Sequence, residues 1–195
     1  MKALAIALVA AASALQLAGQ TYFSDNFDTT GLGQWTGTPN TSAVLVDDGG
    51  AHGWVIAFAE TRSGGDAYTS GFTIPDVANL RISFDYKGDG GFLGFRGTAS
   101  NNHWLAGSQS GYSSALPYTV LSANGDWHHY DIAIPTSEFG RTIMLEDYAV
   151  TSGAERPRDA YFDNIRVYSI PEPSTYALIL GACTLGLVGW RRFRK

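Results

Sequence analysis

The sequence predicts an all-β domain in which two antiparallel sheets pack face to face as a sandwich. Glycine and small polar residues separate ten short runs that are rich in β-branched and aromatic residues, which is the pattern of strands joined by turns. The clearest run, Leu80–Tyr86, alternates apolar and polar side chains, so one face is buried and the other is wet. Because these runs lack the 3.6-residue period of a helix, two sheets must cover each other's apolar faces.

The expected strands follow one another through residues 21–169, which we assign to one domain. In chain order they are Tyr22–Phe27, Ala43–Val46, Trp54–Ala59, Ala67–Phe72, Leu80–Tyr86, Phe92–Arg96, Tyr118–Leu121, Trp127–Ile134, Thr142–Tyr148 and Ala160–Tyr168. In the last of these, the carboxylate of Asp163 stands between Phe162 and Ile165 and interrupts the alternation of inward and outward side chains. This interruption predicts a β-bulge.

Residues 1–20 have the features of a secretory signal peptide. Lys2 precedes the apolar run Ala3–Val9, and Ala12–Ala14 is a cleavage sequence of the A-x-A type. The segment 21–170 then carries eight basic and seventeen acidic side chains, a net charge of −9. An acidic domain repels phosphate backbones, so no nucleic acid is expected as a partner, whereas excess carboxylate suits Ca²⁺.

Residues 170–195 combine three features in a fixed order. Two prolines hold a short motif extended, an apolar run Tyr176–Trp190 follows, and a basic tail ends the sequence. The motif is Pro171, Glu172 and Pro173, and the tail contains Arg191, Arg192, Arg194 and Lys195. This order closely resembles the PEP-CTERM sorting signal of Gram-negative envelope proteins. The resemblance implies a C-terminal sorting peptidase of the exosortase type as a partner, and a precursor held transiently in the inner membrane before it reaches the cell envelope.

The apolar run Tyr176–Trp190 is fifteen residues long, shorter than the roughly 20 residues of a comfortable membrane-spanning helix. The alternative is a buried C-terminal helix of the globular domain. The run is not amphipathic, and basic residues follow it at once, so we prefer a hydrophobic helix that enters the membrane and a tail that stays cytoplasmic.

Motifs near both ends of the domain resemble the galactose-binding-like jelly roll, which is shared by many carbohydrate-binding modules. Asp25–Asp28 contains the opening Phe-acid pair, Trp127 begins a strand, and Ala160–Val167 contains the closing aromatic-Asp-Asn-aliphatic sequence. The resemblance implies a jelly-roll sandwich whose first and last strands lie side by side. Laminin-G and lectin-like sandwiches have the same two-sheet layout and stay open.

The jelly-roll resemblance also implies a structural Ca²⁺ at the ends of these two strands. Matched position by position, Asp28 and Asp163 are the carboxylate ligands, and backbone carbonyls near His52 and Gly53 complete the shell. Ca²⁺ takes six to eight oxygen ligands, which such a set supplies. If no ion binds, Asp28 is expected to be a turn former and Asp163 a solvated strand residue.

Aromatic residues are the candidate ligand contacts. Sugars bind to flat rings, with nearby amides and carboxylates taking their hydroxyls. Trp104 and Asn102 stand at the start of a glycine- and serine-rich stretch that we expect to be a loop, and Tyr112 stands near its end. Trp104, Tyr112 and Asn102 are therefore the expected ligand-binding residues. The other interpretation is that Trp104 folds back into the domain, as is expected of Trp54 and the other tryptophans at the core or its edge.

Signals for catalysis are poor. The sequence has no Gly-x-Ser-x-Gly elbow, phosphate-binding glycine loop or His-Glu-x-x-His, and the adjacent His128 and His129 face opposite sides of a strand. We expect an exported, non-catalytic surface protein that binds extracellular polysaccharide. The alternative is a structural envelope or matrix protein with no small ligand.

Overall fold

A computed structural model describes residues 19–37, 43–58, 65–97, 101–109, 116–147 and 159–171. Within these ranges the chain forms β1 (Thr21–Asp25), β2 (Trp35–Gly37), β3 (Ala43–Asp47), β4 (Trp54–Phe58), β5 (Gly65–Thr69), β6 (Leu80–Gly88), β7 (Gly91–Arg96), β8 (Asn102–Gly107), β9 (Thr119–Val120), β10 (His128–Ala133), the short 3-10 helix η1 (Thr136–Glu138), β11 (Thr142–Asp147) and β12 (Ala160–Ser169).

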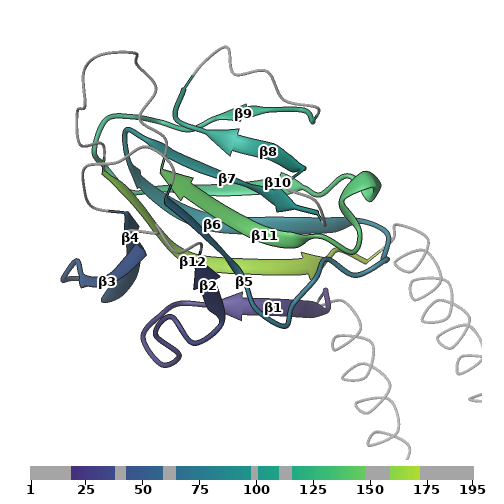
Figure 1. Cartoon of the computed structure of the whole chain (residues 1–195), viewed down its shortest axis with the longest axis horizontal. Helices are drawn as coiled ribbons and strands as arrows, with labels where there is room; N and C mark the ends of the chain where they lie inside the picture. The colour runs from purple at the N-terminus through teal and green to yellow at the C-terminus, as the bar shows by residue number, and fades with distance from the viewer. Residues whose placement is uncertain are drawn as a thin grey trace, which may run out of the picture.

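The strands form two six-stranded sheets that lie one behind the other in Figure 1. Sheet 1 has the order β10-β6-β12-β4-β3 with β1 also paired to β12, and sheet 2 has the order β2-β5-β11-β7-β8-β9. The pairs are antiparallel, except that β8 and β9 run parallel. The predicted all-β sandwich is therefore confirmed, and β1 lies beside β12 as the jelly-roll resemblance implies.

Apolar side chains from the facing sides of the two sheets fill the interior. In β6, Leu80, Ile82, Phe84 and Tyr86 are at most 1% exposed, which confirms the alternation seen in the sequence. They pack in one cluster with residues of sheet 2 such as Leu145. Burying an aliphatic or aromatic side chain of this size stabilises the fold by about 1.5–3 kcal/mol, so this cluster is the main source of stability.

A buried carboxylate fixes the connection between β1 and β2. Asp25 is 3% exposed and accepts hydrogen bonds from the backbone N–H of Phe27 at 2.9 Å, the Thr30 hydroxyl at 2.7 Å and the Trp35 indole N–H at 2.9 Å. Removing this acceptor would leave buried donors without a partner, which is costly. The carboxylate therefore holds Trp35 in the core.

All ten expected strands are present, and the structure adds two that were not expected, β2 and β8. The predicted bulge is also confirmed. The register between β12 and β6 shifts between Asp163 and Arg166, and Asn164 has a positive φ of 50°. As a result, Asp163 points outward while Ile165 packs in the core.

The predicted terminal signals lie outside the described residues. This holds for residues 1–18, for Glu172 and Pro173, for the apolar run Tyr176–Trp190, and for Arg191, Arg192, Arg194 and Lys195; Pro171 is described. Among residues 19–171, as far as they are described, no helix is long and apolar enough to cross a membrane. The signal peptide and the sorting signal stay predictions.

Candidate functional site

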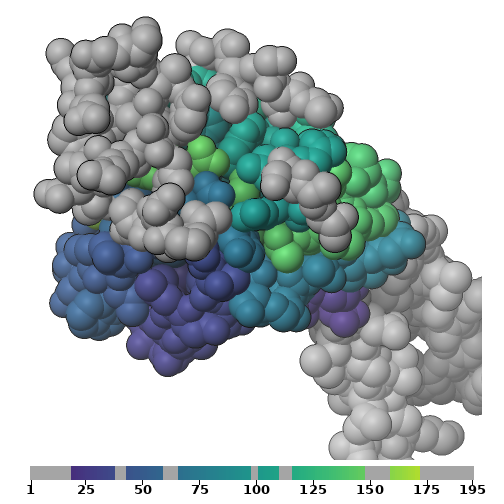
Figure 2. Space-filling view, viewed as in Figure 1, coloured from purple at the N-terminus to yellow at the C-terminus, as the bar shows by residue number. Residues whose placement is uncertain are grey.

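The outer face of sheet 2 combines aromatic and charged side chains. Successive side chains of a strand point to opposite faces, so the strand register defines the members of this face. We call it the Tyr68 face, and its members are Asp66, Tyr68, Phe92, Arg96, Asn102, Trp104, Met144 and Glu146. Phe92, Trp104, Met144 and Glu146 are buried, and the other four members are half-buried. Figure 2 gives the space-filling view of the molecule in the orientation of Figure 1.

Trp104 belongs to the Tyr68 face but is largely buried. It lies in β8 opposite Gly94, is 7% exposed, and its ring centroid is 5.4 Å from that of Phe92. A Cβ atom at residue 94 would lie 2.8 Å from Cε3 of Trp104, so the glycine makes room for the indole. The expectation of an exposed loop tryptophan is wrong. The stretch contains a strand, and the indole covers apolar surface of the sheet.

Two buried polar atoms of the Tyr68 face form no hydrogen bond with any described residue. They are Nη1 of Arg96 and Oδ1 of Asn102, and the two residues lie directly opposite each other in β7 and β8. The Arg96 guanidinium lies over the Tyr68 ring at 4.6 Å, and its Nη1 is 3.7 Å from Oδ2 of Asp66, too far for a hydrogen bond. Because buried polar atoms nearly always have a partner, this donor and acceptor are exceptions that single out the Arg96–Asn102 pair.

A second feature of the Tyr68 face is a neutral carboxyl group. Burial raises the pKa of Glu146 to about 8, and the charges of Asp66 and Asp147 act in the same direction. Burial also raises the pKa of Asp66, which the charge of Arg96 opposes. Asp66 and Glu146 are cross-strand neighbours, so at neutral pH the Glu146 carboxyl donates a hydrogen bond to the Asp66 carboxylate.

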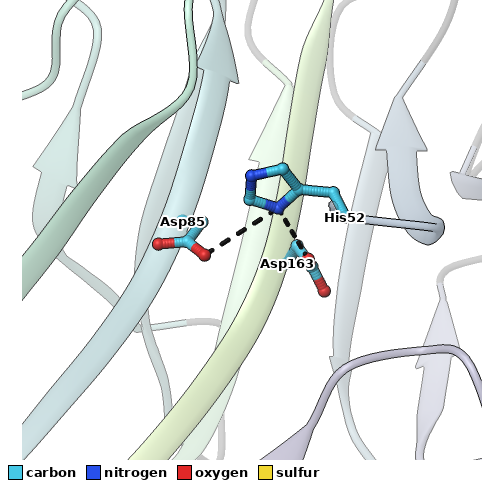
Figure 3. Close-up of side chains that lie close together, drawn as sticks. All are labelled: His52, Asp85 and Asp163. Atoms are coloured by element: carbon cyan, nitrogen blue, oxygen red, sulfur yellow. Dashed lines mark hydrogen bonds and ion pairs between the residues drawn. The ribbon is translucent and has the colours of Figure 1, made fainter. Parts of the chain in front are cut away.

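On the outer face of sheet 1, three side chains meet that we call the His52 cluster: His52, Asp85 and Asp163 (Figure 3). His52 lies between β3 and β4, Asp85 in β6 and Asp163 in β12. Nδ1 of His52 is 2.8 Å from Oδ2 of Asp163 and 3.9 Å from Oδ2 of Asp85. Burial raises the pKa of Asp163, although hydrogen bonds from His52 and from the backbone N–H of Asn164 oppose this effect.

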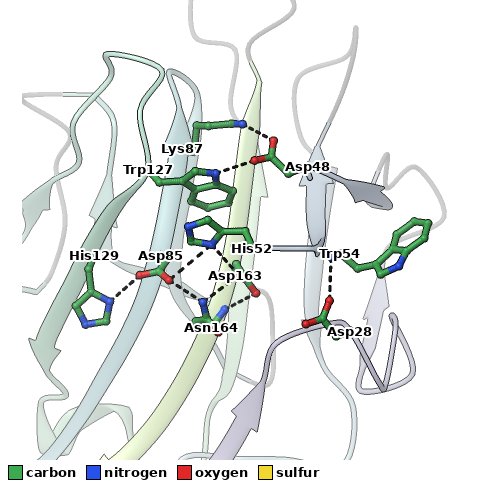
Figure 4. Close-up of polar contacts among 10 residues, drawn as sticks. All are labelled: Asp28, Asp48, His52, Trp54, Asp85, Lys87, Trp127, His129, Asp163 and Asn164. Carbon is green, nitrogen blue, oxygen red and sulfur yellow. Dashed lines mark hydrogen bonds and ion pairs between the residues drawn. The ribbon is translucent and has the colours of Figure 1, made fainter. Parts of the chain in front are cut away.

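Neighbouring side chains fix the orientation of the His52 ring (Figure 4). Trp127 stacks on it, with ring centroids 4.0 Å apart and an interplanar angle of 15°. The indole N–H of Trp127 donates to Oδ2 of Asp48 at 2.8 Å, and Lys87 pairs with the same carboxylate. Burial alone would raise the pKa of Asp48, but the hydrogen bonds from Lys87 and Trp127 outweigh it and lower the pKa.

The two expected calcium ligands point to different places. Asp163 belongs to the His52 cluster, whereas Oδ1 of Asp28 accepts the backbone N–H of Trp54 at 3.0 Å, apart from the cluster in Figure 4. The side chains next to Asp163 are those of His52 and Asp85 rather than that of Asp28. Trp54 also differs from expectation, because it is 46% exposed rather than part of the core.

Two of the three expected sugar-binding residues lie on the Tyr68 face. Asn102 lies on the Tyr68 face together with Trp104, while Tyr112 lies outside the described residues. Sequence reasoning missed Tyr68, Arg96 and Asp85. Arg96 is a charged residue at the end of the apolar run Phe92–Arg96, which was the only sequence feature that singled it out. Nothing in the sequence indicated that it lies opposite Asn102.

No protein-family model matches this sequence, and no curated protein matches it. Among solved structures, the tandem of two family 22 carbohydrate-binding modules from Paenibacillus barcinonensis Xyn10C has a TM-score of 0.52 at 15% identity, over 78% of this chain and 51% of that chain. The xylan-binding first module of that protein gives 0.48 at 11% identity, over 80% and 97%. The cleaved adhesin domain of Lys-gingipain from Porphyromonas gingivalis gives 0.45 at 13% identity, over 77% and 99%.

The chain thus has the jelly-roll sandwich fold of carbohydrate-binding modules, and it spans about half the length of the tandem structure. At 15% identity this similarity shows the fold alone. Fold does not imply function, so the side chains of the two outer faces must indicate what the protein binds.

Proposed function

We propose that this chain is an exported, non-catalytic protein of the cell envelope that binds polysaccharide on its Tyr68 face. The observation that carries the proposal is the cross-strand pair of Arg96 and Asn102, which offers a buried donor and a buried acceptor without a described hydrogen-bond partner. A sugar hydroxyl donates one hydrogen bond and accepts others. A sugar hydroxyl admitted next to this pair would supply the kind of partner that each atom lacks.

The rest of the Tyr68 face supports a sugar ligand. The half-buried Tyr68 supplies aromatic surface beside the Arg96 guanidinium, and the neutral Glu146 carboxyl adds a polar group without a full charge. The fold likeness to a tandem of carbohydrate-binding modules agrees with this assignment by analogy. Export and sorting rest on the signal peptide and on the PEP-CTERM-like segment that begins at Pro171.

The test is binding of the full chain, purified in mild detergent, to a polysaccharide array, followed by calorimetry on any ligand found. Asn102→Ala removes one hydrogen bond, worth about 0.5–1.5 kcal/mol, and should weaken binding up to roughly tenfold. Arg96→Lys keeps the charge but loses the planar fork and should weaken binding by a similar factor.

Trp54→Ala is the matched control, because Trp54 is an exposed aromatic residue of sheet 1 outside the Tyr68 face. Its affinity should equal that of the wild type. Loss of binding in this variant, with unchanged affinity in Asn102→Ala and Arg96→Lys, would move the site to the β3–β4 end of the sandwich. A wild type that binds no polysaccharide would instead favour a structural envelope or matrix protein.

A further inference from the structure

We propose that the His52 cluster binds a divalent first-row transition-metal ion such as Zn²⁺, with Nδ1 of His52 and one carboxylate oxygen each from Asp85 and Asp163 as ligands. The three ligand atoms lie within 4.8 Å of one another, and the residues converge from a loop and two neighbouring strands (Figure 3). The site is on sheet 1, so it does not depend on polysaccharide binding at the Tyr68 face.

The distances suit a small ion. A tetrahedral Zn²⁺ with bonds of 2.0–2.2 Å places its ligand atoms about 3.3–3.6 Å apart. The separations of His52 Nδ1 from Asp163 Oδ2, 2.8 Å, and from Asp85 Oδ2, 3.9 Å, lie on either side of that range. Small side-chain rotations would therefore place all three ligands around one ion.

The two negative charges of the cluster also favour a bound cation. Asp85 and Asp163 lie directly opposite each other in β6 and β12, and like charges at such positions destabilise a sheet. The Asn164 amide Nδ2 donates to both carboxylates, at 2.8 Å to Asp85 and 3.0 Å to Asp163. An amide bridge of this kind carries no net charge, so an ion with two positive charges would offset the repulsion more fully.

Residues next to the His52 cluster are placed so that they can orient the metal ligands. His129 Nδ1 is 2.6 Å from Oδ1 of Asp85, the oxygen turned away from His52, and Trp127 holds the imidazole plane by stacking. Such outer partners fix the direction of the ligand atoms before the ion binds. Figure 4 shows Trp127 against His52 and His129 beside Asp85.

The ligand set disagrees with the structural Ca²⁺ that the jelly-roll resemblance implies. Ca²⁺ takes six to eight oxygen ligands, but an imidazole nitrogen lies 2.8 Å from Oδ2 of Asp163, and Asp28 accepts the backbone N–H of Trp54 instead. Imidazole together with carboxylate suits Zn²⁺ and its neighbours in the first transition series. Three protein ligands also leave a coordination position for water or another ligand.

A bound ion would tie the β3–β4 connection to the centre of sheet 1. His52 lies in this connection, between Gly50 and Gly53, which both have positive φ, and its cluster partners lie in β6 and β12. Binding to the folded state alone stabilises a protein by mass action. At a hundredfold excess over Kd, the melting temperature should rise by roughly 5–10 °C.

The test uses the full chain in mild detergent, freed of metal with a chelator and then titrated with ZnCl₂ by calorimetry and thermal melting. We expect one saturable Zn²⁺ site per chain and at least tenfold weaker binding in His52→Gln. His128→Gln is the matched control, because His128 contacts Asn124 outside the cluster, and it should bind Zn²⁺ as the wild type does. Co²⁺ titration should give visible absorption bands in the wild type that His52→Gln lacks.

Thermal melting in the presence of chelator shows whether His52→Gln is folded. If it is not, the Zn²⁺ affinity of Asp85→Asn is compared with that of the wild type instead. The proposal is overturned if the wild type takes up no Zn²⁺ saturably, or if folded His52→Gln and Asp85→Asn bind it as tightly as the wild type. It is also overturned if millimolar Ca²⁺ raises the melting temperature while Zn²⁺ does not, because that result would favour an oxygen-only site.

Discussion

Replacing Glu146 with Gln should make the protein less sensitive to alkaline pH. In the folded state the pKa of Glu146 is about 8 against an ordinary value of 4.5. Because the folded state keeps a proton that the unfolded state loses above pH 4.5, Glu146 favours folding at low pH, and this contribution falls as the pH rises to about 8. Each pKa unit is worth about 1.4 kcal/mol, so the loss has an upper bound of about 5 kcal/mol.

The assay is the free energy of unfolding in urea at several values between pH 5 and pH 9. Other groups also titrate in this range, so the informative quantity is the difference between Glu146→Gln and the wild type. A Gln amide can donate to Asp66 as the neutral carboxyl does, and the variant should gain on the order of a few kcal/mol relative to the wild type by pH 9. Asp126→Asn, at an exposed turn, is the control and should follow the wild-type profile. A Glu146→Gln profile parallel to the wild type would refute a neutral, buried Glu146.

Three further predictions follow from the same structure. Trp104→Ala should cost about 3–5 kcal/mol of unfolding free energy, measured in urea, because the indole is packed against Phe92; a loss below 1 kcal/mol would contradict its burial. Asn102→Ala should unfold no more readily than the wild type, since it removes a buried acceptor without a described partner, and a large loss in thermal melting would show that Oδ1 is bonded. Glu172→Ala should leave export intact but keep the precursor in the inner membrane, as tested by fractionation; normal surface delivery would contradict the sorting assignment.

The fold was largely predictable because most strands carry their own signal. The alternation in β6 and the break at Asp163 depend only on neighbours in sequence, and both were read correctly. β2 spans only Trp35–Gly37, too short to show a period. β8 was missed because Trp104 packs on one face of sheet 2 while Leu105 and Ala106 belong to the core cluster, so both faces are apolar and no alternation appears.

The sites were harder to predict because they depend on register and on loop placement. Asp85 meets Asp163 only through the pairing of β6 with β12, and His52 is 111 residues from Asp163 in sequence. The resemblance paired Asp163 with Asp28, whereas the structure places His52 and Asp85 next to Asp163, because strand order does not give side-chain direction. Asn102 was named for its amide, yet its partner Arg96 follows from the β7–β8 register alone.

Polysaccharide binding on the Tyr68 face can be followed through side-chain N–H signals in NMR while an oligosaccharide is titrated into the protein. We expect the Arg96 guanidinium and Asn102 amide signals to shift together along one saturable curve, while the exposed Trp54 indole signal stays in place. A shift of the Trp54 signal with unchanged Arg96 and Asn102 signals would contradict the claim.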